Sequence, residues 1–342
     1  MLKYLLFLSL LLTFEVLSQE YNPPTEKRGI VLYPSDIISV GSEQWVSILK
    51  QSDINLLGIH ADSRFETLPK LKTFVESKEG QILFKECYKN GVDVEFELHI
   101  LQDILARSLF DTHPAYFRMD ENGIRQKEYN MCFTSEGAYL EIEKKTCEIL
   151  EWLHPTTHRY FFWTDDVQDA FCHCEKCKGY SESEQALIFE NRLLKITQKK
   201  DPRTTVAHLA YNNTLKAPEK IKPSDGVFLE YAPISRDYTI GLTEKQLEVL
   251  KENLQVFPAS TTHILEYWLD ASMFSRWKRE NLQKVPWVQE YCQRDVYTYR
   301  SLGVKSITSF GAWINKDYLD LYGVQHVRDM FMEYGNILKS GN

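Results

Sequence analysis

The stretch Phe161–Cys177, FFWTDDVQDAFCHCEKC, combines an apolar segment, an acid pair and a cysteine cluster. Three consecutive aromatic residues are typical of a buried β-strand. Two adjacent carboxylates, Asp165 and Asp166, follow this segment directly. Neighbouring carboxylates repel each other and resist burial, so a buried structural strand has little reason to end in such a pair. In parallel β/α barrels, this end of a strand is where catalytic residues lie.

Short β-branched or aromatic segments alternate with amphipathic segments from about residue 29 onward. We expect amphipathic helices at 136–153, 184–199 and 243–253. The alternation predicts βαβ units and a parallel sheet. Strands are expected at Gly29–Tyr33, Ile54–His60, Asp93–His99, Arg159–Thr164, Thr204–Tyr211, Gly226–Tyr231, Thr262–Trp268 and Ser306–Phe310.

Eight such units in 342 residues fit an α/β fold of the (β/α)8 TIM-barrel class. We expect a single barrel domain at 20–342, with long loops after the third and fourth strands. A doubly wound open sheet is the alternative, but its G-x-G-x-x-G fingerprint is missing from the sequence. The long third connection, 101–135, lies on the predicted active face, where long loops are usually functional.

Composition and charge limit the classes of partner. Hydrophobic residues make up 43% of the chain, which is enough for a sizeable core. The formal net charge of −8 argues against a nucleic-acid partner, because phosphate binding needs a basic surface. No cofactor is expected, and no residue is assigned as an active-site metal ligand.

Residues 1–19 have the pattern of a signal peptide: Lys3, a leucine-rich run, and Ser18 near a plausible cleavage point. The run is too short for a comfortable membrane span, so no stable span is expected. We therefore predict an exported protein, either periplasmic or secreted. A buried N-terminal helix is the alternative.

Polar and aromatic side chains gather at the predicted strand ends, which in a barrel surround one mouth. Mixed carboxylates and aromatics suit a sugar site, since aromatic rings stack on sugar faces while acids donate or accept protons. Asp62 also follows the second strand. The candidate substrate-binding residues are His60, Arg64, His99, Tyr211, Asn212, Arg236, Trp268, Asp270, Trp313 and Asn315.

The candidate catalytic residues are Asp165, Asp166, Glu230 and Glu266. Glycoside hydrolysis needs a protonated acid and a second carboxylate. The pair at the end of the fourth strand could supply the acid, and Glu230 or Glu266 the opposing group. Alternatively, one aspartate caps a turn while the other pairs with an arginine. Each glutamate could equally form a structural salt bridge at the barrel rim.

Seven cysteines are present, and three of them form the pattern C-x-C-x-x-C at 172–177. Cys132 lies in the preceding connection, so we expect Cys132, Cys172, Cys174 and Cys177 to be structural and to include neighbours on the active face. A zinc knuckle is one interpretation. For an exported protein, disulfide bonds are favoured over zinc.

The segments WTDDVQDAFCHCEKC and SESEQALIFENRLL resemble the α-glucuronidase-like barrel family of uncharacterised exported bacterial proteins. The segments HPAYFRMDENGIR, NMCFTSEG, AYNNT and EYAPISRDY also fit its pattern, so the resemblance covers most of residues 90–240. It implies a glycoside hydrolase-type TIM barrel. Members often carry additional domains around the barrel.

An aromatic strand that ends in two aspartates is also similar to the O-GlcNAcase and hyaluronidase-type β-N-acetylhexosaminidases. That resemblance implies that Asp165 orients the acetamido group of the substrate and that Asp166 is the general acid. The cysteine insertion after Asp166 departs from that family.

We therefore expect an exported glycoside hydrolase-like protein, a glycosidase that acts on an oligosaccharide or glycoconjugate. The alternative is a carbohydrate-binding barrel without catalysis, because fold does not fix function. A zinc-dependent hydrolase based on the cysteines is a third interpretation.

Overall fold

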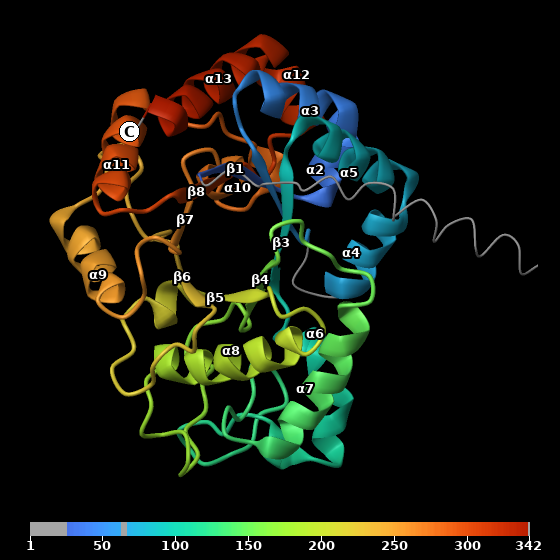
Figure 1. Cartoon of the computed structure of the whole chain (residues 1–342), viewed down its shortest axis with the longest axis vertical. Coiled ribbons are helices and arrows are strands. Elements are labelled where there is room, and N and C mark those ends of the chain that lie inside the picture. Colours follow the sequence, from blue (N-terminus) through green and yellow to red (C-terminus); the bar gives the residue numbers. More distant parts are fainter. Residues whose placement is uncertain (1–25, 63–66, 341–342) are drawn as a thin grey trace, which may run out of the picture.

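The computed structural model describes residues 26–62 and 67–340. The predicted signal peptide at 1–19 and the candidate residue Arg64 lie outside the described residues. Within the described ranges, eight parallel strands form a closed barrel in the order β1 to β8, each pairing with its neighbours in sequence and β1 with β8 (Figure 1). The predicted single-domain (β/α)8 barrel is confirmed.

Every strand end lies within two residues of its predicted position, and β3 and β8 match at both ends. They are β1 (Lys27–Leu32), β2 (Leu56–His60), β3 (Asp93–His99), β4 (Arg159–Trp163), β5 (Thr205–Ala210), β6 (Val227–Tyr231), β7 (His263–Glu266) and β8 (Ser306–Phe310).

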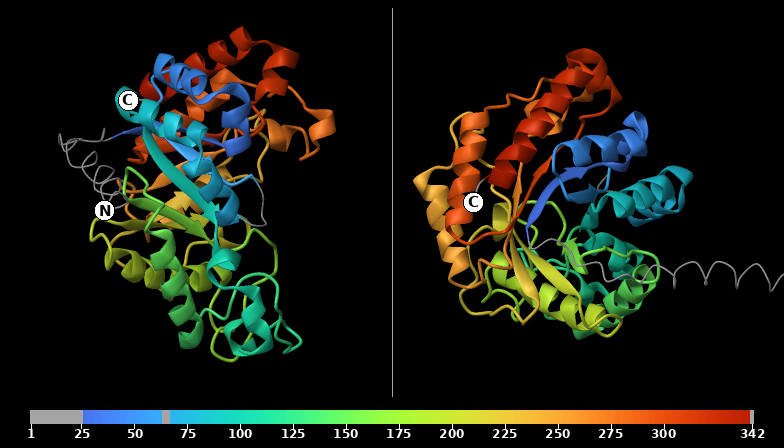
Figure 2. Two further views of the ribbon diagram at one scale, coloured as in Figure 1. Left: turned by 90° about the vertical axis from the view of Figure 1, so that its right-hand side faces the viewer. Right: turned by 45° about the horizontal axis from the view of Figure 1, so that its top comes forward.

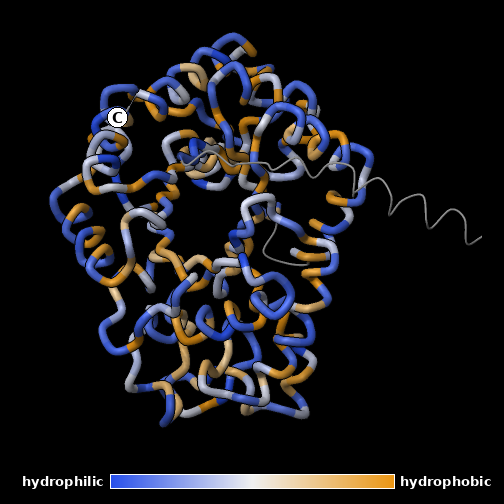
Figure 3. The backbone as a smooth tube through the Cα atoms, in the orientation of Figure 1, coloured by the Kyte–Doolittle hydropathy of each residue, from blue (hydrophilic) through white to orange (hydrophobic). Residues whose placement is uncertain are grey.

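Helices surround the barrel, and hydrophobic residues concentrate along the strands (Figures 1 to 3). The helices are α2 (Pro34–Val40), α3 (Ser42–Gln51), α4 (Thr67–Glu76), α5 (Lys78–Asn90), α6 (Leu101–Ile104), α7 (Glu136–Ile149), α8 (Glu182–Gln198), α9 (Glu244–Leu254), α10 (Ala271–Phe274), α11 (Gln289–Ser301), α12 (Lys316–Tyr322) and α13 (Val324–Ser340). Short 3-10 helices are η2 (Arg107–Asp111), η3 (Pro114–Tyr116), η4 (Asn212–Thr214) and η5 (Arg279–Asn281).

Among the described residues, none of these helices combines the length and the apolar character needed to cross a membrane.

Side-chain alternation along the strands fills the barrel interior. Phe161 of β4 packs against Phe228 of β6, with ring centroids 5.4 Å apart. Near the amino-terminal end, Arg159 pairs with the fully buried Glu95 at 2.6 Å. The interior is therefore a packed core that forms the floor beneath the strand ends, as expected for a barrel of this size.

The long connections after β3 and β4 lie next to each other. The β3–α7 connection contains α6, η2 and η3, whereas the β4–α8 connection contains no helix. A backbone hydrogen bond links them, because His173 N donates to Met119 O at 2.8 Å. The two predicted long loops are thus one contiguous structure beside the barrel mouth.

Candidate active site

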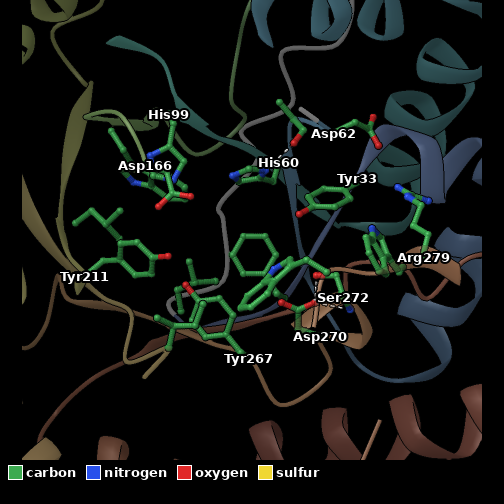
Figure 4. Close-up of a pocket in the computed structure, with 18 residues that line it drawn as sticks. Tyr33, His60, Asp62, His99, Asp166, Tyr211, Tyr267, Asp270, Ser272 and Arg279 are labelled. Atoms are coloured by element: carbon green, nitrogen blue, oxygen red, sulfur yellow. Dashed lines mark hydrogen bonds between the residues drawn. The ribbon is translucent and has the colours of Figure 1, made fainter. Parts of the chain in front are cut away.

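The carboxyl ends of the strands open into a cavity of about 530 Å³ (Figure 4). Its lining comes from every part of the barrel and combines aromatic rings with the carboxylates of Asp62, Asp166 and Asp270. A volume of this size is typical of small-molecule sites, and the place is where barrel enzymes hold their substrates.

Aromatic rings form the floor of the cavity. His99 contacts Trp163 with centroids 4.9 Å apart, and His60 contacts Phe310 at 5.4 Å. Tyr267 stacks on Phe310 at 5.3 Å and 21°. These residues stand at the carboxyl ends of β2, β3, β4, β7 and β8 with their side chains turned inward, so the floor is rigid. Such a surface suits a ligand with a flat or apolar face.

The two predicted histidines both line the cavity. Nδ1 of His60 lies 2.8 Å from Ala61 O, and Nδ1 of His99 lies 2.6 Å from Thr164 O. Because a carbonyl oxygen only accepts, each Nδ1 carries the hydrogen. Burial, with His99 adding to it, lowers the pKa of His60 to about 4. Near neutral pH, His60 is therefore uncharged, and its Nε2 is an acceptor.

The acid pair after β4 divides into two different roles. Asp166 is half-buried and lines the cavity. Asp165 faces the β3–α7 connection: its Oδ2 accepts from Arg107 Nη2 at 2.7 Å and from Asn130 N at 2.5 Å, and its Oδ1 accepts from Gln102 N at 3.1 Å. The structure corrects the placement of Asp165 in the reacting pair, because both of its oxygens anchor a loop.

Asp270 follows β7 and lines the cavity away from Asp166, beside Ser272 and Arg279 (Figure 4). It caps α10, and its Oδ1 accepts from Ser272 N at 2.9 Å and from Met273 N at 3.2 Å. Burial raises the pKa of Asp270 to about 6, while hydrogen bonds from Ser272 and Met273 hold it back. A carboxyl group of this kind is partly protonated in mildly acidic solution.

Glu230 lies inside the barrel beneath the cavity. Its Oε2 accepts from Trp163 Nε1 at 2.7 Å, and Trp163 is the residue that lines the cavity above it. Burial, and then the negative charge of Glu97, raises the pKa of Glu230 well above its usual value. The structure therefore corrects the prediction of Glu230 as a cavity carboxylate, because an aromatic ring covers it.

Glu266 points to the opposite face of its strand. Leu265 and Tyr267 line the cavity, so strict alternation turns Glu266 outward toward α11. There it accepts from Arg236 Nη1 at 2.8 Å, and Arg236 Nη2 also donates to Asp295 at 2.5 Å. The role predicted for Glu266 in the cavity is corrected, because it belongs to a buried ion-pair network. Arg236 shares that network with a side chain that is 1% exposed, and it borders the cavity that adjoins the main one.

The remaining predicted contacts also divide. Tyr211 and Trp313 line the cavity, and Asn212 borders an adjoining one of about 600 Å³ together with Tyr211. Trp268 instead packs outward on Tyr334, with ring centroids 6.2 Å apart. Asn315 accepts from Tyr318 N at 3.2 Å as the cap of α12. Those two placements are corrected, because strand alternation and helix capping turn the side chains away.

Several lining residues were not predicted, namely Tyr33, Tyr267, Trp277 and Arg279. Tyr33 and Tyr267 immediately follow β1 and β7, and the alternation along those strands could have identified them. Trp277 and Arg279 lie in the segment after α10, where no periodic signal exists. Arg279 lies over the ring of Trp313, 4.7 Å from its centroid.

The four predicted structural cysteines do come together, beside the cavity rather than on its lining. Their sulfur atoms all lie within 4.8 Å of one another, and all four side chains are buried. The structure records them as free cysteines. The predicted proximity is confirmed, whereas the favoured disulfide bonds are not present in this structure.

Comparisons with known proteins identify the family of this chain and similar folds. A family model described as a domain of unknown function, DUF4838, matches residues 43–315. The chain belongs to this family. The match spans most of the barrel and both long connections. A search of curated proteins finds no match.

Solved structures similar to this DUF4838 member are barrel enzymes. An O-GlcNAc hydrolase mutant from Thermobaculum terrenum matches with TM-score 0.53 and 12% identity over 92% of this chain and 60% of that chain. A β-N-acetylhexosaminidase matches with TM-score 0.54 and 12% identity over 92% and 72%. A β-galactosidase from the psychrophilic Marinomonas ef1 matches with TM-score 0.52 and 12% identity over 84% of this chain and 54% of that chain.

The chain therefore spans 60% of the length of the first of these proteins and about half of the third. At 12% identity these likenesses establish the fold, and the chemistry has to be argued from the site itself.

Proposed function

We propose that this DUF4838 protein is an exported glycoside hydrolase that acts on an oligosaccharide or glycoconjugate. The observation that carries the proposal is the cavity at the barrel mouth, where an aromatic floor lies between the carboxylates of Asp166 and Asp270. Sugar rings stack on aromatic faces, and glycosidic bonds are cleaved by paired carboxyl groups. The structurally similar barrels include an O-GlcNAc hydrolase, a β-N-acetylhexosaminidase and a β-galactosidase, which supports the same class.

Asp166 and Asp270 replace the pairs that the sequence predicted. They follow β4 and β7, so they approach the cavity from separate parts of the barrel. Asp270 is the better proton donor because burial raises its pKa to about 6. Asp166 is then the second carboxylate, as nucleophile or base. This assignment reverses the general-acid role that the hexosaminidase resemblance implies for Asp166.

A substrate longer than one sugar fits the shape of the site. The adjoining cavity shares Tyr211, Ile234 and Trp277 with the main one. Together they offer neighbouring positions for successive sugar units, with Trp277 exposed at their common edge. We expect turnover to increase from disaccharides to longer substrates.

The resemblance to α-glucuronidase-like proteins implies an acidic sugar. Arg279 is a cation on the cavity lining, positioned over Trp313, and could pair with a sugar carboxylate. Arg279→Met should then lower kcat/KM for uronides by about tenfold to a hundredfold and leave neutral glycosides nearly unchanged. Equal losses on both substrate classes would contradict an acidic sugar.

The decisive experiment compares Asp166→Asn and Asp270→Asn on glycosides with good and poor leaving groups. Loss of the acid slows poor leaving groups by about 10²- to 10⁴-fold and good ones much less, since only poor leaving groups need protonation. Loss of the nucleophile or base slows both. We expect the first pattern for Asp270→Asn and the second for Asp166→Asn.

Asp62→Asn is the matched control. Asp62 lines the same cavity, but it is exposed and accepts from the backbone N of Ser35 at 3.2 Å. This variant should keep most of the activity. If both Asp166→Asn and Asp270→Asn turn over substrate at the wild-type rate, the proposed pair is overturned. If the wild-type protein binds sugar tightly and turns none over, the non-catalytic binding barrel is favoured.

The pH dependence tests the acid separately. A donor that must be protonated loses activity as pH rises through its pKa, so kcat/KM should fall above about pH 6. This fall of kcat/KM at higher pH should be absent in Asp270→Asn when substrates with good leaving groups are used.

Export is proposed from the pattern of residues 1–19. Fractionation of cells that express the full chain should place a shortened protein outside the cytoplasm, and deletion of residues 2–18 should retain it inside. A full-length cytoplasmic protein would contradict export.

A further inference from the structure

The cysteine cluster consists of Cys132 from the β3–α7 connection and Cys172, Cys174 and Cys177 from the β4–α8 connection. The Sγ atom of Cys132 lies 3.7 Å from that of Cys174 and 3.9 Å from that of Cys177. Every pair of sulfur atoms is within 4.8 Å. Two disulfides would divide four sulfurs into two close pairs, whereas here all four share one centre.

We propose that the cysteine cluster binds one structural Zn²⁺ ion. Zinc binds thiolates at about 2.3 Å with tetrahedral geometry, which places neighbouring sulfurs about 3.8 Å apart. The separations of 3.7 and 3.9 Å from Cys132 Sγ to the sulfurs of Cys174 and Cys177 match this sulfur–sulfur distance. All four ligands are cysteines, so no position stays open for water or substrate, and the site is structural rather than catalytic.

The surroundings of the sulfurs suit thiolates. Met119 N donates to Cys172 Sγ at 3.3 Å, and the Thr134 hydroxyl lies 3.3 Å from Cys177 Sγ. Arg125 Nη1 lies 4.0 Å from Cys172 Sγ. A zinc ion with four thiolates carries a net charge of −2, and these donors and the guanidinium offset it.

The backbone has the compact turn that a C-x-x-C ligand pair needs. Cys177 N donates to Cys174 O at 2.8 Å, and Lys178 N donates to the same oxygen at 2.9 Å. This turn brings both side chains to one side, as in a zinc knuckle.

A metal would also supply stability that this part of the chain lacks. The cysteine cluster is separate from the main hydrophobic core, with only Met119 packed against it as a partly buried apolar neighbour among the described residues. Small regions without their own core are commonly held by disulfides or by a metal. The ion would hold the β3–α7 connection to the segment that follows Asp166, so its effect on activity is through positioning.

Metal analysis of the full-length protein tests the proposal without any variant. Protein is purified from a reducing cytoplasm and, separately, from an oxidising compartment, and zinc is counted per chain together with free thiols. One zinc per chain in both samples supports the proposal. Two disulfides with no metal in the oxidising sample, or iron in place of zinc, would overturn it. Replacement by Co²⁺ should produce the visible absorption of tetrahedral cobalt thiolate.

Variants locate the ion. Cys174→Ser should lower bound zinc at least tenfold, whereas Cys147→Ser, on α7 and outside the cysteine cluster, should retain one ion per chain. Should Cys174→Ser fail to fold, release of zinc from wild-type protein by a mercurial is measured instead, with protease cleavage of 106–131 as the readout. Zinc release without faster cleavage there would contradict the structural role, and the result does not depend on the hydrolase proposal.

Discussion

Glu97 is a buried carboxyl group in the barrel interior. It is fully buried, and neither of its oxygens has a hydrogen-bond partner among the described residues. Burial, and then the negative charge of Glu95, raises its pKa well above the usual 4.5. A carboxylate oxygen of Glu230 and a ring nitrogen of His263 lie within 4.8 Å of a carboxylate oxygen of Glu97. Burial among these groups therefore favours the protonated, neutral form of Glu97.

This placement predicts a pH-dependent stability. A carboxyl with a raised pKa holds its proton in the folded state after the unfolded chain has lost it, so stability falls as pH rises above about 4.5. Glu97→Gln removes this slope. The free energy of unfolding of Glu97→Gln relative to wild type should rise by up to about 1.4 kcal/mol per pH unit. Urea denaturation between about pH 4.5 and 7.5 measures it, with exposed Glu248→Gln as control.

Trp277 offers a prediction about binding alone. It is 64% exposed and lines both adjoining cavities, so it contributes little to the core. Trp277→Ala should raise KM by about threefold to tenfold through lost stacking, with kcat and stability nearly unchanged. Tyr297→Ala, on α11 and 67% exposed, is the control. An unchanged KM on every substrate would contradict a sugar-stacking role.

At the scale of elements, the ion-pair network of Glu266, Arg236 and Asp295 joins β7, the β6–α9 connection and α11. Glu266 also accepts from Tyr238 at 2.9 Å and from the Tyr299 hydroxyl. Glu266→Gln leaves Arg236 with one carboxylate. It should lower the free energy of unfolding by about 3 kcal/mol, because a buried charge loses one of its partners. Thermal and urea unfolding check it. Activity per folded molecule should persist, and the exposed-pair variant Lys200→Ala should change stability little.

The β3–α7 connection depends on Asp165 in a similar way. Asp165→Asn weakens the contacts to Arg107 and Asn130, so the segment 106–131 should open more often. Limited proteolysis should cut there at least several times faster than in wild type or in Asp166→Asn. Equal cleavage rates would show that Asp165 does not anchor the loop.

At the scale of the whole molecule, the barrel was predictable because its signals are local. Most strands are short apolar runs followed by an α-helix, although only the 3-10 helix η4 lies between β5 and β6. Such alternation has few other arrangements. Helix starts were predictable too: Thr243 caps α9 with Gln246 in a capping box.

The site was predictable in its position and only partly in its members. His60, His99, Tyr211, Asp166, Asp270 and Trp313 line the cavity as expected. Glu230 and Glu266 share the local sequence Leu-Glu-Tyr, yet one points into the barrel beneath Trp163 and the other outward to Arg236. A one-residue difference in where a strand enters the barrel reverses the facing of its side chains, and short motifs do not contain that information.

Local patterns in the chain predict the barrel, the mouth at which the polar residues gather and the closeness of the four cysteines. Apolar periodicity and strand-end chemistry act over a few residues, so they are visible in a single chain. Only the tertiary structure decided the facing of each acid. It separated Asp165 from Asp166, turned Glu266 toward Arg236 and brought four sulfurs to one centre. Those outcomes depend on register and on loops far apart in sequence that pack together, which no local pattern specifies.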